Sequence, residues 1–562
     1  MRKHSSTDDD RPRPLLMGLS LAILLAPTHP AYADTIYRVD TNAPGPVHDG
    51  TSWATAYTDL QDALGNPSLG SGDQVWVAEG TYIPSSPSTP SERHATFSIP
   101  QNIKLRGGYA GFGATDPDAR DVDAYLTVLS GDRGDVGDET DNCYHVVKIF
   151  FATAATHLDG FTITHGYAHN GECDDLDPLS WGGGAYIFMG CPTVMDCTFT
   201  GNSACAGGGV FSGGEADTVF INCVFIGNEA TSDSRLTLGG GGLLSASAGD
   251  VELYNCTFFD NHATGSNGGG LWLGWGMGSK SPGMSFQKLV NCTIVDNSAS
   301  YCGGGIFVVG SVPELYNCVL WGNTDCGQRC GPTYGSNCTE LAQLDDDSQD
   351  RHVEEGEQGQ GPMGTFTIDY SCLEGWSESY YSGTGTIGGA PGHNPLFFGS
   401  GDLHLQPSSP CINTGDATEL PDDDWDLDGD QDTDEDLPLD LDGAPRVNGI
   451  IDMGVYEYAD CNSNDIPDVC DFTCDGHCDD YPGCGESHDC DGDNIPDECD
   501  SCPWDLSGNG TVDPYDLGLL KSHYGCNVAL YPCECGVYDL SGDGYVNPID
   551  VGVLKQNYGP CP

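Results

Sequence analysis

The amino-acid sequence predicts a mainly β fold, a right-handed parallel β-helix whose successive coils stack along one axis. Three observations within residues 181–324 support this prediction: a short segment ending in Asn recurs, a glycine run with an apolar pair separates the copies, and no helical period lies between them. The five copies span residues 195–202, 221–228, 254–261, 290–297 and 316–323. Self-similarity of this kind is the signature of a stacked-repeat architecture.

Each copy alternates apolar and polar side chains, as in Met195, Cys197 and Phe199. Period two predicts a strand, and we expect this apolar row to point inward. The central cysteines of the copies should then stack in the core as small apolar residues. They are Cys197, Cys223, Cys256, Cys292 and Cys318.

The asparagine that ends each copy is expected to mark a corner of the coil. Asn tolerates a left-handed backbone, and its amide can bond to the equivalent residue of the next coil. These residues are Asn202, Asn228, Asn261, Asn297 and Asn323. A second polar row is expected to face outward, either as an exposed polar surface or as a ladder that binds a glycan. Its members are Asp196, Asn222, Asn255, Asn291 and Asn317.

The pairing of Gly-Gly-apolar with Phe-x-x-Asn resembles the repeats of polymorphic outer-membrane proteins of the autotransporter type. More broadly, residues 35–458 resemble the parallel β-helix repeats of the pectate-lyase-like superfamily. The resemblance implies an exported β-helix, and in the enzymes of that superfamily it implies action on polysaccharides.

The composition restricts the compartment and the partners. Residues 1–33 combine early basic residues, an apolar run at 15–26 and a small-residue site before Asp34, which predicts a secretory signal peptide. No later apolar run approaches the ~20 residues of a membrane-spanning helix. We therefore expect a secreted, extracellular or cell-surface protein, with disulfides among its 27 cysteines. A formal net charge of −66 makes nucleic acid an unsuitable partner and favours divalent cations.

Residues 34–458 are assigned to the β-helix. A short amphipathic helix at 51–64 is expected to cover the first open coil, because an uncovered end exposes strand edges. Early strands are expected at 74–78, 103–105, 127–129, 145–149 and 160–164. Residues 325–360 are expected to form an inserted loop, and residues 394–458 resemble a closing coil.

Residues 459–502 form a linker rich in Cys and Asp, in which residues 460–471 recur as 489–500. The two segments resemble thrombospondin type-3 calcium repeats, although the glycine of an EF-hand loop is missing at Asp465 and Asn494. A disulfide-tied acidic linker without calcium is the alternative. The expected calcium ligands are Asp460, Asn462, Asn464, Asp468, Asp471, Asp489, Asp491, Asp493, Asp497 and Asp500.

Residues 503–562 contain two 12-residue loops, each followed by an apolar helical segment. Calcium takes oxygen ligands from loop positions 1, 3, 5, 7, 9 and 12, with glycine at position 6, here Gly510 and Gly544. The first loop supplies Asp505, Ser507, Asn509, the Thr511 carbonyl, Asp513 and Asp516. The second loop supplies Asp539, Ser541, Asp543, the Tyr545 carbonyl, Asn547 and Asp550.

Two such loop–helix units resemble a dockerin, a small α-helical EF-hand pair. The resemblance implies bound calcium and a cohesin partner, with Lys521 and Lys555 at positions that contact the cohesin. Pro514-Tyr515 and Pro548-Ile549 replace the Ser-Thr pair of well-known dockerins. A calcium-stabilised terminal cap is the alternative.

The sequence favours an exported, calcium-binding β-helix that serves as a scaffold, in adhesion or in carbohydrate binding. The alternative is a polysaccharide lyase or glycoside hydrolase, which needs clustered Asp/Asp or Asp/Arg side chains on one outward sheet. The sequence identifies no such cluster, so the catalytic residues remain unknown and a polysaccharide partner remains a hypothesis.

Overall fold

A computed structural model describes residues 35–85, 92–325, 340–346 and 367–458, and short pieces of 511–560. Within these ranges it leaves out 136, 171–172, 174–176, 215, 233–237, 247–248, 275–284, 310, 342–343, 376–382, 390–391, 400, 407, 424, 426, 428–436, 438, 444–445 and 447–450. Beyond residue 458 it describes 511–512, 517, 519–521, 523–524, 538, 540, 545–556 and 559–560. No helix among these residues is long and apolar enough to cross a membrane.

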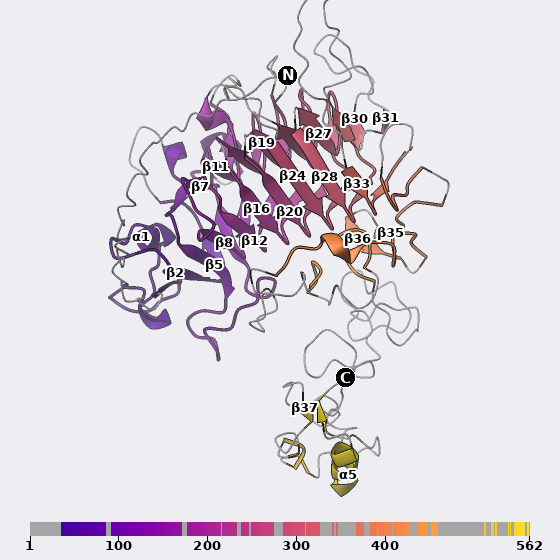
Figure 1. Ribbon diagram of the computed structural model, residues 1–562. Coiled ribbons are helices and arrows are strands. Elements are labelled where there is room, and N and C mark those ends of the chain that lie inside the picture. The colour runs from indigo at the N-terminus through magenta and orange to yellow at the C-terminus, as the bar shows by residue number, and fades with distance from the viewer. Residues whose placement is uncertain are drawn as a thin grey trace, which may run out of the picture.

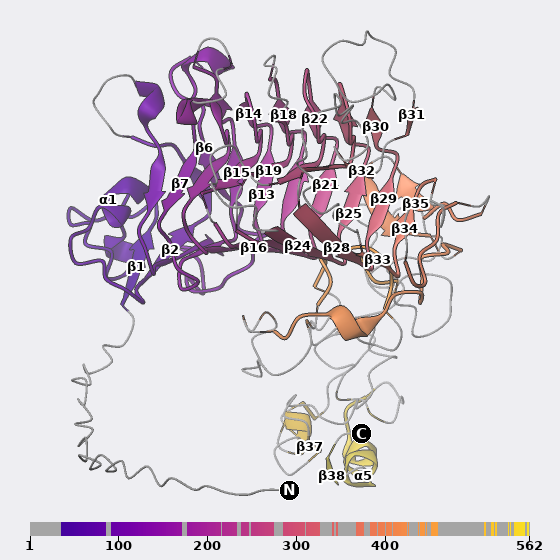
Figure 2. The ribbon, with the colours of Figure 1, turned by 45° about the horizontal axis from the view of Figure 1, so that its top comes forward.

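Four long sheets, which we name A to D, run along the solenoid (Figures 1 and 2). Sheet A contains β1 (Ile36–Val39), β2 (Gln74–Ala78), β5 (Lys104–Tyr109), β8 (His157–Asp159), β12 (Thr193–Met195), β16 (Thr218–Ile221), β20 (Val251–Tyr254), β24 (Ser285–Val290), β28 (Ser311–Tyr316) and β33 (Thr367–Asp369). Sheet B contains β3 (Gly80–Tyr82), β6 (Thr127–Ser130), β9 (Thr162–Thr164), β13 (Thr198–Thr200), β17 (Val224–Ile226), β21 (Thr257–Phe259), β25 (Thr293–Val295), β29 (Val319–Trp321) and β34 (Cys372–Leu373).

Sheet C contains β4 (Phe97–Ile99), β7 (Val147–Phe150), β11 (Ala185–Phe188), β15 (Val210–Gly213), β19 (Leu243–Ala246), β23 (Leu271–Gly274), β27 (Ile306–Val309) and β32 (Leu344–Asp346). Sheet D contains β10 (Tyr167–Ala168), β14 (Ser203–Ala204), β18 (Glu229–Ala230), β22 (His262–Ala263), β26 (Ser298–Ala299), β30 (Thr324–Asp325) and β31 (Glu340–Leu341). Within sheets A to D, all described strand pairs are parallel except β30 with β31.

One coil visits the sheets in a fixed order. The chain passes through β12, β13, β14 and β15 before it returns to sheet A as β16. Each strand pairs in parallel with the equivalent strand of the next coil, as β12 pairs with β16. The predicted parallel β-solenoid is therefore confirmed, while its right-handed sense stays a prediction of the sequence.

The solenoid interior is one continuous apolar core that runs through the coils. The five repeat cysteines lie in it as buried free thiols, as predicted. Their Sγ atoms donate to backbone carbonyls of the preceding coil, for example Cys223 to Val194 at 3.4 Å. These cysteines therefore act as small core residues.

The predicted asparagine ladder is present and fully buried. In Asn261, Nδ2 donates to Asn297 Oδ1 at 2.9 Å, and Oδ1 accepts from the Asn228 backbone at 3.1 Å. The prediction of a left-handed backbone at these asparagines is wrong. Positive φ occurs one residue earlier, as at Gly227 and Asp260, and at the first polar residue of each copy, as at Asp196. The amide therefore joins the coils, while its neighbour turns the chain.

The prediction that each copy is one strand with Met195, Cys197 and Phe199 on one inward face is also wrong. Each copy is two strands, because a left-handed residue such as Asp196 (φ 49°) lies between β12 and β13. This turn interrupts the alternation, so Val194 and Cys197 point into the core while Met195 packs outside it. The same holds for Ile221, Tyr254, Val290 and Tyr316.

The ends of the solenoid differ. Helix α1 (Leu60–Leu64) and the 3-10 turn η1 (Trp53–Thr55) replace the longer helix expected at 51–64. Leu60 and Ala63 insert into the core, so α1 covers the first coil as expected. Further 3-10 turns are η2 (Glu92–His94), η3 (Glu139–Asp141), η4 (Pro178–Ser180) and η6 (Ala417–Glu419).

Residues 394–458 do not form the closing coil that the resemblance implies. They contain the antiparallel hairpin of β35 (Phe397–Gly399) and β36 (Asp402–Leu405), followed by a segment that crosses the outside of sheet A. We call residues 411–458 the strap. In the C-terminal module, β37 (Thr511–Val512) pairs with β38 (Gly559–Pro560), and α5 spans Pro548–Gln556.

Candidate functional site

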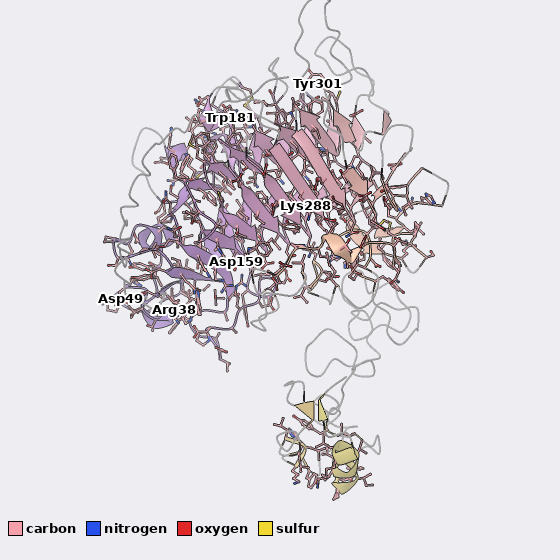
Figure 3. The ribbon with its side chains drawn as sticks, in the orientation of Figure 1. Arg38, Asp49, Asp159, Trp181, Lys288 and Tyr301 are labelled. Carbon is pink, nitrogen blue, oxygen red and sulfur yellow. A yellow bond between two sulfur atoms is a disulfide. The ribbon has the colours of Figure 1, made fainter. Side chains whose placement is uncertain are left out.

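The outer face of sheet A carries two rows of side chains that the strand register defines. In the first row, Arg38 pairs with Trp76, Trp76 with Arg106, and Arg106 with Asp159. In the second row, Gln74 is followed by Lys104 and His157. Figure 3 labels Arg38 and Asp159 on the early strands and Lys288 farther along the same face. The first four strands thus present three cations and a single carboxylate on these rows.

Asp159 is the centre of this arrangement and is 1% exposed. Arg106 Nε donates to Asp159 Oδ2 at 2.8 Å, and Arg120 NH2 pairs with Asp159 Oδ1. Arg120 comes from the loop after β5 and also donates through Nε to the Gly107 carbonyl at 3.0 Å. Two guanidiniums therefore hold one buried carboxylate by charge-assisted hydrogen bonds.

Gly160 makes this approach of Arg120 sterically possible. It has φ 80°, and a Cβ at this position would lie 2.7 Å from Arg120 NH2. A left-handed backbone at this point favours glycine, and any larger residue would displace the guanidinium from Asp159.

Asp196 lies in the next coil, at the turn after β12, and is half-buried. Asn222 Nδ2 donates to Asp196 Oδ1 at 3.1 Å. Burial, followed by the charge of Asp159, raises the pKa of Asp196 to about 7. A carboxyl that changes charge near neutral pH beside two guanidiniums can act as a general acid or base.

Aromatic rings lie beside the cations. Trp76 stacks on Tyr109 with ring centroids 4.5 Å apart and an interplanar angle of 11°. The Arg38 guanidinium lies 5.3 Å from the Trp76 ring centroid, within cation–π range. The face therefore combines positive charge with a flat apolar surface, the two properties that bind an acidic sugar ring.

From β12 onward the first row becomes apolar and the strap covers it. The row contributes Met195, Ile221, Tyr254, Val290 and Tyr316 to this contact. The strap contributes Ala417, Leu420, Trp425, Leu427, Leu437 and Ile451. Burial of this apolar surface holds the strap on the sheet. Polar residues of the first row are thus confined to the first four strands, whereas the second row carries Glu252, Lys288 and Glu314 farther along the sheet.

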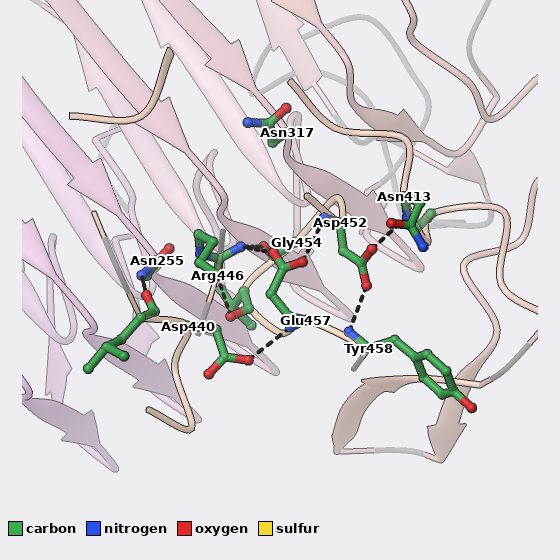
Figure 4. A network of polar contacts seen from close by, with 12 residues as sticks. Asn255, Asn317, Asn413, Asp440, Arg446, Asp452, Gly454, Glu457 and Tyr458 are labelled. Carbon is green, nitrogen blue, oxygen red and sulfur yellow. Dashed lines mark hydrogen bonds and ion pairs between the residues drawn. The ribbon is translucent and has the colours of Figure 1, made fainter. Parts of the chain in front are cut away.

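The strap also binds the outer polar ladder that the sequence identified (Figure 4). Asn255 Nδ2 donates to the Leu439 carbonyl at 2.8 Å, and Asn317 exchanges two hydrogen bonds with the backbone of Asp416. Asn255, Asn291 and Asn317 are 0% exposed. Neither interpretation of these three residues, as an exposed polar face or as a glycan ladder, is correct. Asp196 and Asn222, at the start of the ladder, stay half-buried.

Arg446 fixes the strap and is itself 1% exposed. It pairs with Glu457 Oε1 at 2.6 Å and donates to the Val455 carbonyl at 2.7 Å. With its amide oxygen turned toward the guanidinium, Asn291 accepts from Arg446 at 2.9 and 3.1 Å. Burial raises the pKa of Glu457 and of Asp452, and the positive charge of Arg446 opposes this rise at both carboxyls. The Arg446 guanidinium therefore links two parts of the strap to each other and links the strap to the outer polar ladder.

His404 connects the β35–β36 hairpin to the strap. Its Nδ1 lies 2.7 Å from Asp402 Oδ1, and its Nε2 lies 2.6 Å from Asp442 Oδ2. Burial opposes the charged imidazolium, but the two carboxylates prevail and raise the pKa of His404 to about 9. Its contribution to stability is complete below about pH 6.5 and is lost as the pH rises through 9.

Four of the predicted calcium ligands lie among the described residues: Thr511, Tyr545, Asn547 and Asp550. Asn547 Oδ1 accepts from the Ile549 backbone at 2.8 Å, and Asp550 Oδ2 accepts from the Asn547 backbone at 2.6 Å. These reciprocal bonds form a capping box at the start of α5. The other predicted ligands, including all ten in the linker, lie outside the described residues, so the calcium sites stay predictions.

Sequence reasoning missed Arg106, Arg120 and Asp159 as a group. Arg106 and Asp159 are 53 residues apart, and Arg120 reaches Asp159 from 39 residues away. The only local signal was the strand-like Leu105-Arg-Gly-Gly-Tyr109, which gives no partner for its arginine. Trp272 and Trp321 pack against apolar clusters, and Trp275 lies outside the described residues.

Neither a family model nor a curated protein sequence matches the chain. Among solved structures, pectate lyase Pel9A is similar at 11% identity and TM-score 0.35, covering 75% of this chain and 96% of that one. Pectin methylesterase PemA from Erwinia chrysanthemi matches at 10% identity and TM-score 0.28, covering 63% and 82%. The Aspergillus niger pectin methylesterase matches at 11% identity and TM-score 0.30, covering 64% and 88%. Identities and TM-scores this low carry no information about activity.

We predict that Arg446→Met destabilises the strap far more than Lys288→Met. Loss of Arg446 leaves the buried Glu457 carboxylate unpaired, which costs about 3–5 kcal/mol. Lys288 also contacts the strap, through Glu419 at 3.4 Å, but this pair is partly exposed and contributes at most about 1 kcal/mol. Urea unfolding and hydrogen exchange of residues 411–458 measure both losses, and equal losses would contradict the assignment.

Proposed function

We propose that this chain is an exported carbohydrate-binding β-helix protein that holds an acidic polysaccharide on the first four strands of sheet A. The observation that carries the proposal is the concentration of Arg38, Lys104 and Arg106 on one face of a chain with a net charge of −66. Arg38 is paired with Asp118 at 3.3 Å and Arg106 with Asp159 at 2.8 Å, so a polyanionic ligand would share these two guanidiniums and pair with Lys104.

The overall negative charge does not prevent this binding. At physiological ionic strength the Debye length is about 8 Å, so distant carboxylates are largely screened while contacting cations are not. A uronate carboxylate can accept hydrogen bonds from Lys104 and Arg106, and Trp76 offers its ring to the apolar face of the sugar. The strap, which begins to cover the face at Met195, bounds the binding surface on its far side.

Binding to polygalacturonate tests the proposal, with uncharged dextran as the control ligand. We expect Lys104→Gln to weaken polygalacturonate binding about 10- to 150-fold, as the loss of a charge-assisted hydrogen bond of about 1.5–3 kcal/mol would. Lys288→Gln is a matched control, because Lys288 occupies the same outer row beside the strap and its loss changes the net charge equally. Equal binding of dextran, or equal effects of the two variants, would overturn the proposal.

A second candidate function, polysaccharide lyase, is favoured by the raised pKa of Asp196. In β-elimination, ionised Asp196 would take the C5 proton of a uronate while Arg120 binds the uronate carboxylate. The C5–H and C4–O bonds break, a C4=C5 double bond forms, and water protonates the leaving oxygen; the hydroxide left behind then takes the proton from Asp196 and becomes water again.

We expect the ultraviolet absorbance of an unsaturated uronate to develop when the protein is incubated with polygalacturonate. A general base works in its ionised form, so kcat/KM should rise as the pH passes through about 7. Asp196→Asn should abolish the reaction and leave binding intact. Release of reducing sugar without an unsaturated product would indicate a hydrolase. If no product formed at all, polysaccharide binding without catalysis would be the function.

We further propose that residues 503–562 form a dockerin-like EF-hand pair that binds calcium and a cohesin-bearing partner, and that the 459–502 repeats also bind calcium. The support is the spacing of oxygen ligands in the two loops and the capping box at Asn547 and Asp550, since a loop that ends on a capped helix suits an EF-hand. The signal peptide at residues 1–33 would export the whole chain.

Chelation of the full chain tests the calcium proposal. We expect removal of calcium to expose the 459–562 region to limited proteolysis, while the strands of sheets A to D stay resistant because stacking holds them. Restored protection with millimolar Ca²⁺ but not with Mg²⁺ would support the EF-hand assignment. Cleavage that does not depend on calcium would contradict it.

A further inference from the structure

A cluster of soft ligands lies at sheet D, in a part of the solenoid away from the row on sheet A. The register pairs Ala168 with Ala204 and Ala204 with Ala230. The residues that follow, His169, Cys205 and Thr231, therefore occupy equivalent positions in three successive coils. Cys173 lies beside them and forms a disulfide with Cys205.

The imidazole faces both sulfur atoms. His169 Nδ1 lies 3.6 Å from Cys205 Sγ and 3.9 Å from Cys173 Sγ. Thr231 contributes its Oγ1, 3.5 Å from His169 Nδ1, and its carbonyl oxygen, 3.4 Å from Cys173 Sγ. The three ligand atoms of His169, Cys173 and Cys205 all lie within 4.8 Å of one another.

These distances match a zinc coordination sphere. Zinc binds sulfur at about 2.3 Å and nitrogen at about 2.0–2.1 Å in a tetrahedron, which places its nitrogen and sulfur ligands about 3.5 Å apart. The imidazole of His169 already lies near this spacing from each sulfur. Only the two sulfur atoms, bonded in the disulfide, would have to separate.

His169 is also held in an orientation that suits a metal ligand. Its Nε2 lies 2.9 Å from Ser203 Oγ. A hydrogen bond at the far nitrogen fixes the orientation of a ligating imidazole and leaves the near nitrogen free to bind.

We propose that His169, Cys173 and Cys205 form a redox-gated zinc site. A dithiol reductant transfers two electrons and two protons to the Cys173–Cys205 disulfide, which gives two thiols and the oxidised reductant. Zn²⁺ then displaces the two thiol protons and binds both thiolates and His169 Nδ1. The Thr231 carbonyl oxygen or a water completes the tetrahedron. Thiolate and imidazole ligands select zinc over calcium, so this site is chemically distinct from the predicted calcium loops.

The site would tether the same chain segment in either redox state. The disulfide or the zinc ion joins the segment after β10 to the end of β14 in the next coil. The two forms exclude each other, because sulfurs bonded to each other are not thiolate ligands.

The test is a Co²⁺ titration of the full chain, before and after treatment with a dithiol, followed through the thiolate-to-cobalt absorption band. After reduction we expect the unsubstituted chain to bind one more equivalent of Co²⁺ than the His169→Ala variant, which keeps both cysteines. Cys173→Ser should lose the same equivalent. Cys191→Ser is the matched control, because Cys191 is a half-buried free thiol outside the cluster and its loss should leave the count unchanged.

Ser203→Ala should retain the site with affinity reduced about 10- to 100-fold, as for other partners of metal-bound imidazoles. Circular dichroism of each variant checks that the solenoid remains folded. Equal cobalt equivalents in the parent and in His169→Ala would overturn the proposal. The proposal would also be overturned if this cluster bound as much Co²⁺ before reduction as after it, since the disulfide form offers no thiolate.

Discussion

The structure depends on hydrogen bonds that join identical positions in successive coils. Asn202, Asn228, Asn261, Asn297 and Asn323 form the clearest case, because Nδ2 of each of the first four donates to Oδ1 of the next asparagine in the stack. A shift of one residue in any coil would leave buried amide groups unpaired, at about 1–3 kcal/mol each. The ladder therefore fixes the register, and the register decides which side chains become neighbours on every sheet.

That register gives sheet A two different outer surfaces. Over the first four strands it aligns cations, Trp76 and the Asp159 carboxylate. Beyond them it aligns apolar residues, which the strap covers. The buried ion pair of Arg446 with Glu457 makes attachment of the strap depend on one guanidinium. The same sheet thus separates an area suited to a polar ligand from an area that serves the fold.

The cluster at sheet D follows the same logic of stacked positions. His169, Cys205 and Thr231 are far apart in the sequence, yet equivalent positions in adjacent coils lie only about 4.8 Å apart. A solenoid can therefore assemble a ligand set from single residues in successive repeats. The cationic row of sheet A is built in this way as well, which explains why neither group can be recognised in a linear motif.

The sequence by itself determined the stacked-repeat fold, the buried cysteines and the asparagine ladder, because each of these recurs in five successive copies and needs only local periodicity. Tertiary structure decided what the turns do. The left-handed residue at Asp196 and its equivalents sends Met195 outside the core, and alternation alone cannot reveal such a turn. Tertiary structure also decided the partners of Asp159 and the course of the strap, because these contacts join residues that are tens of positions apart in the sequence. Such contacts depend on strand register and burial, which no local sequence pattern encodes.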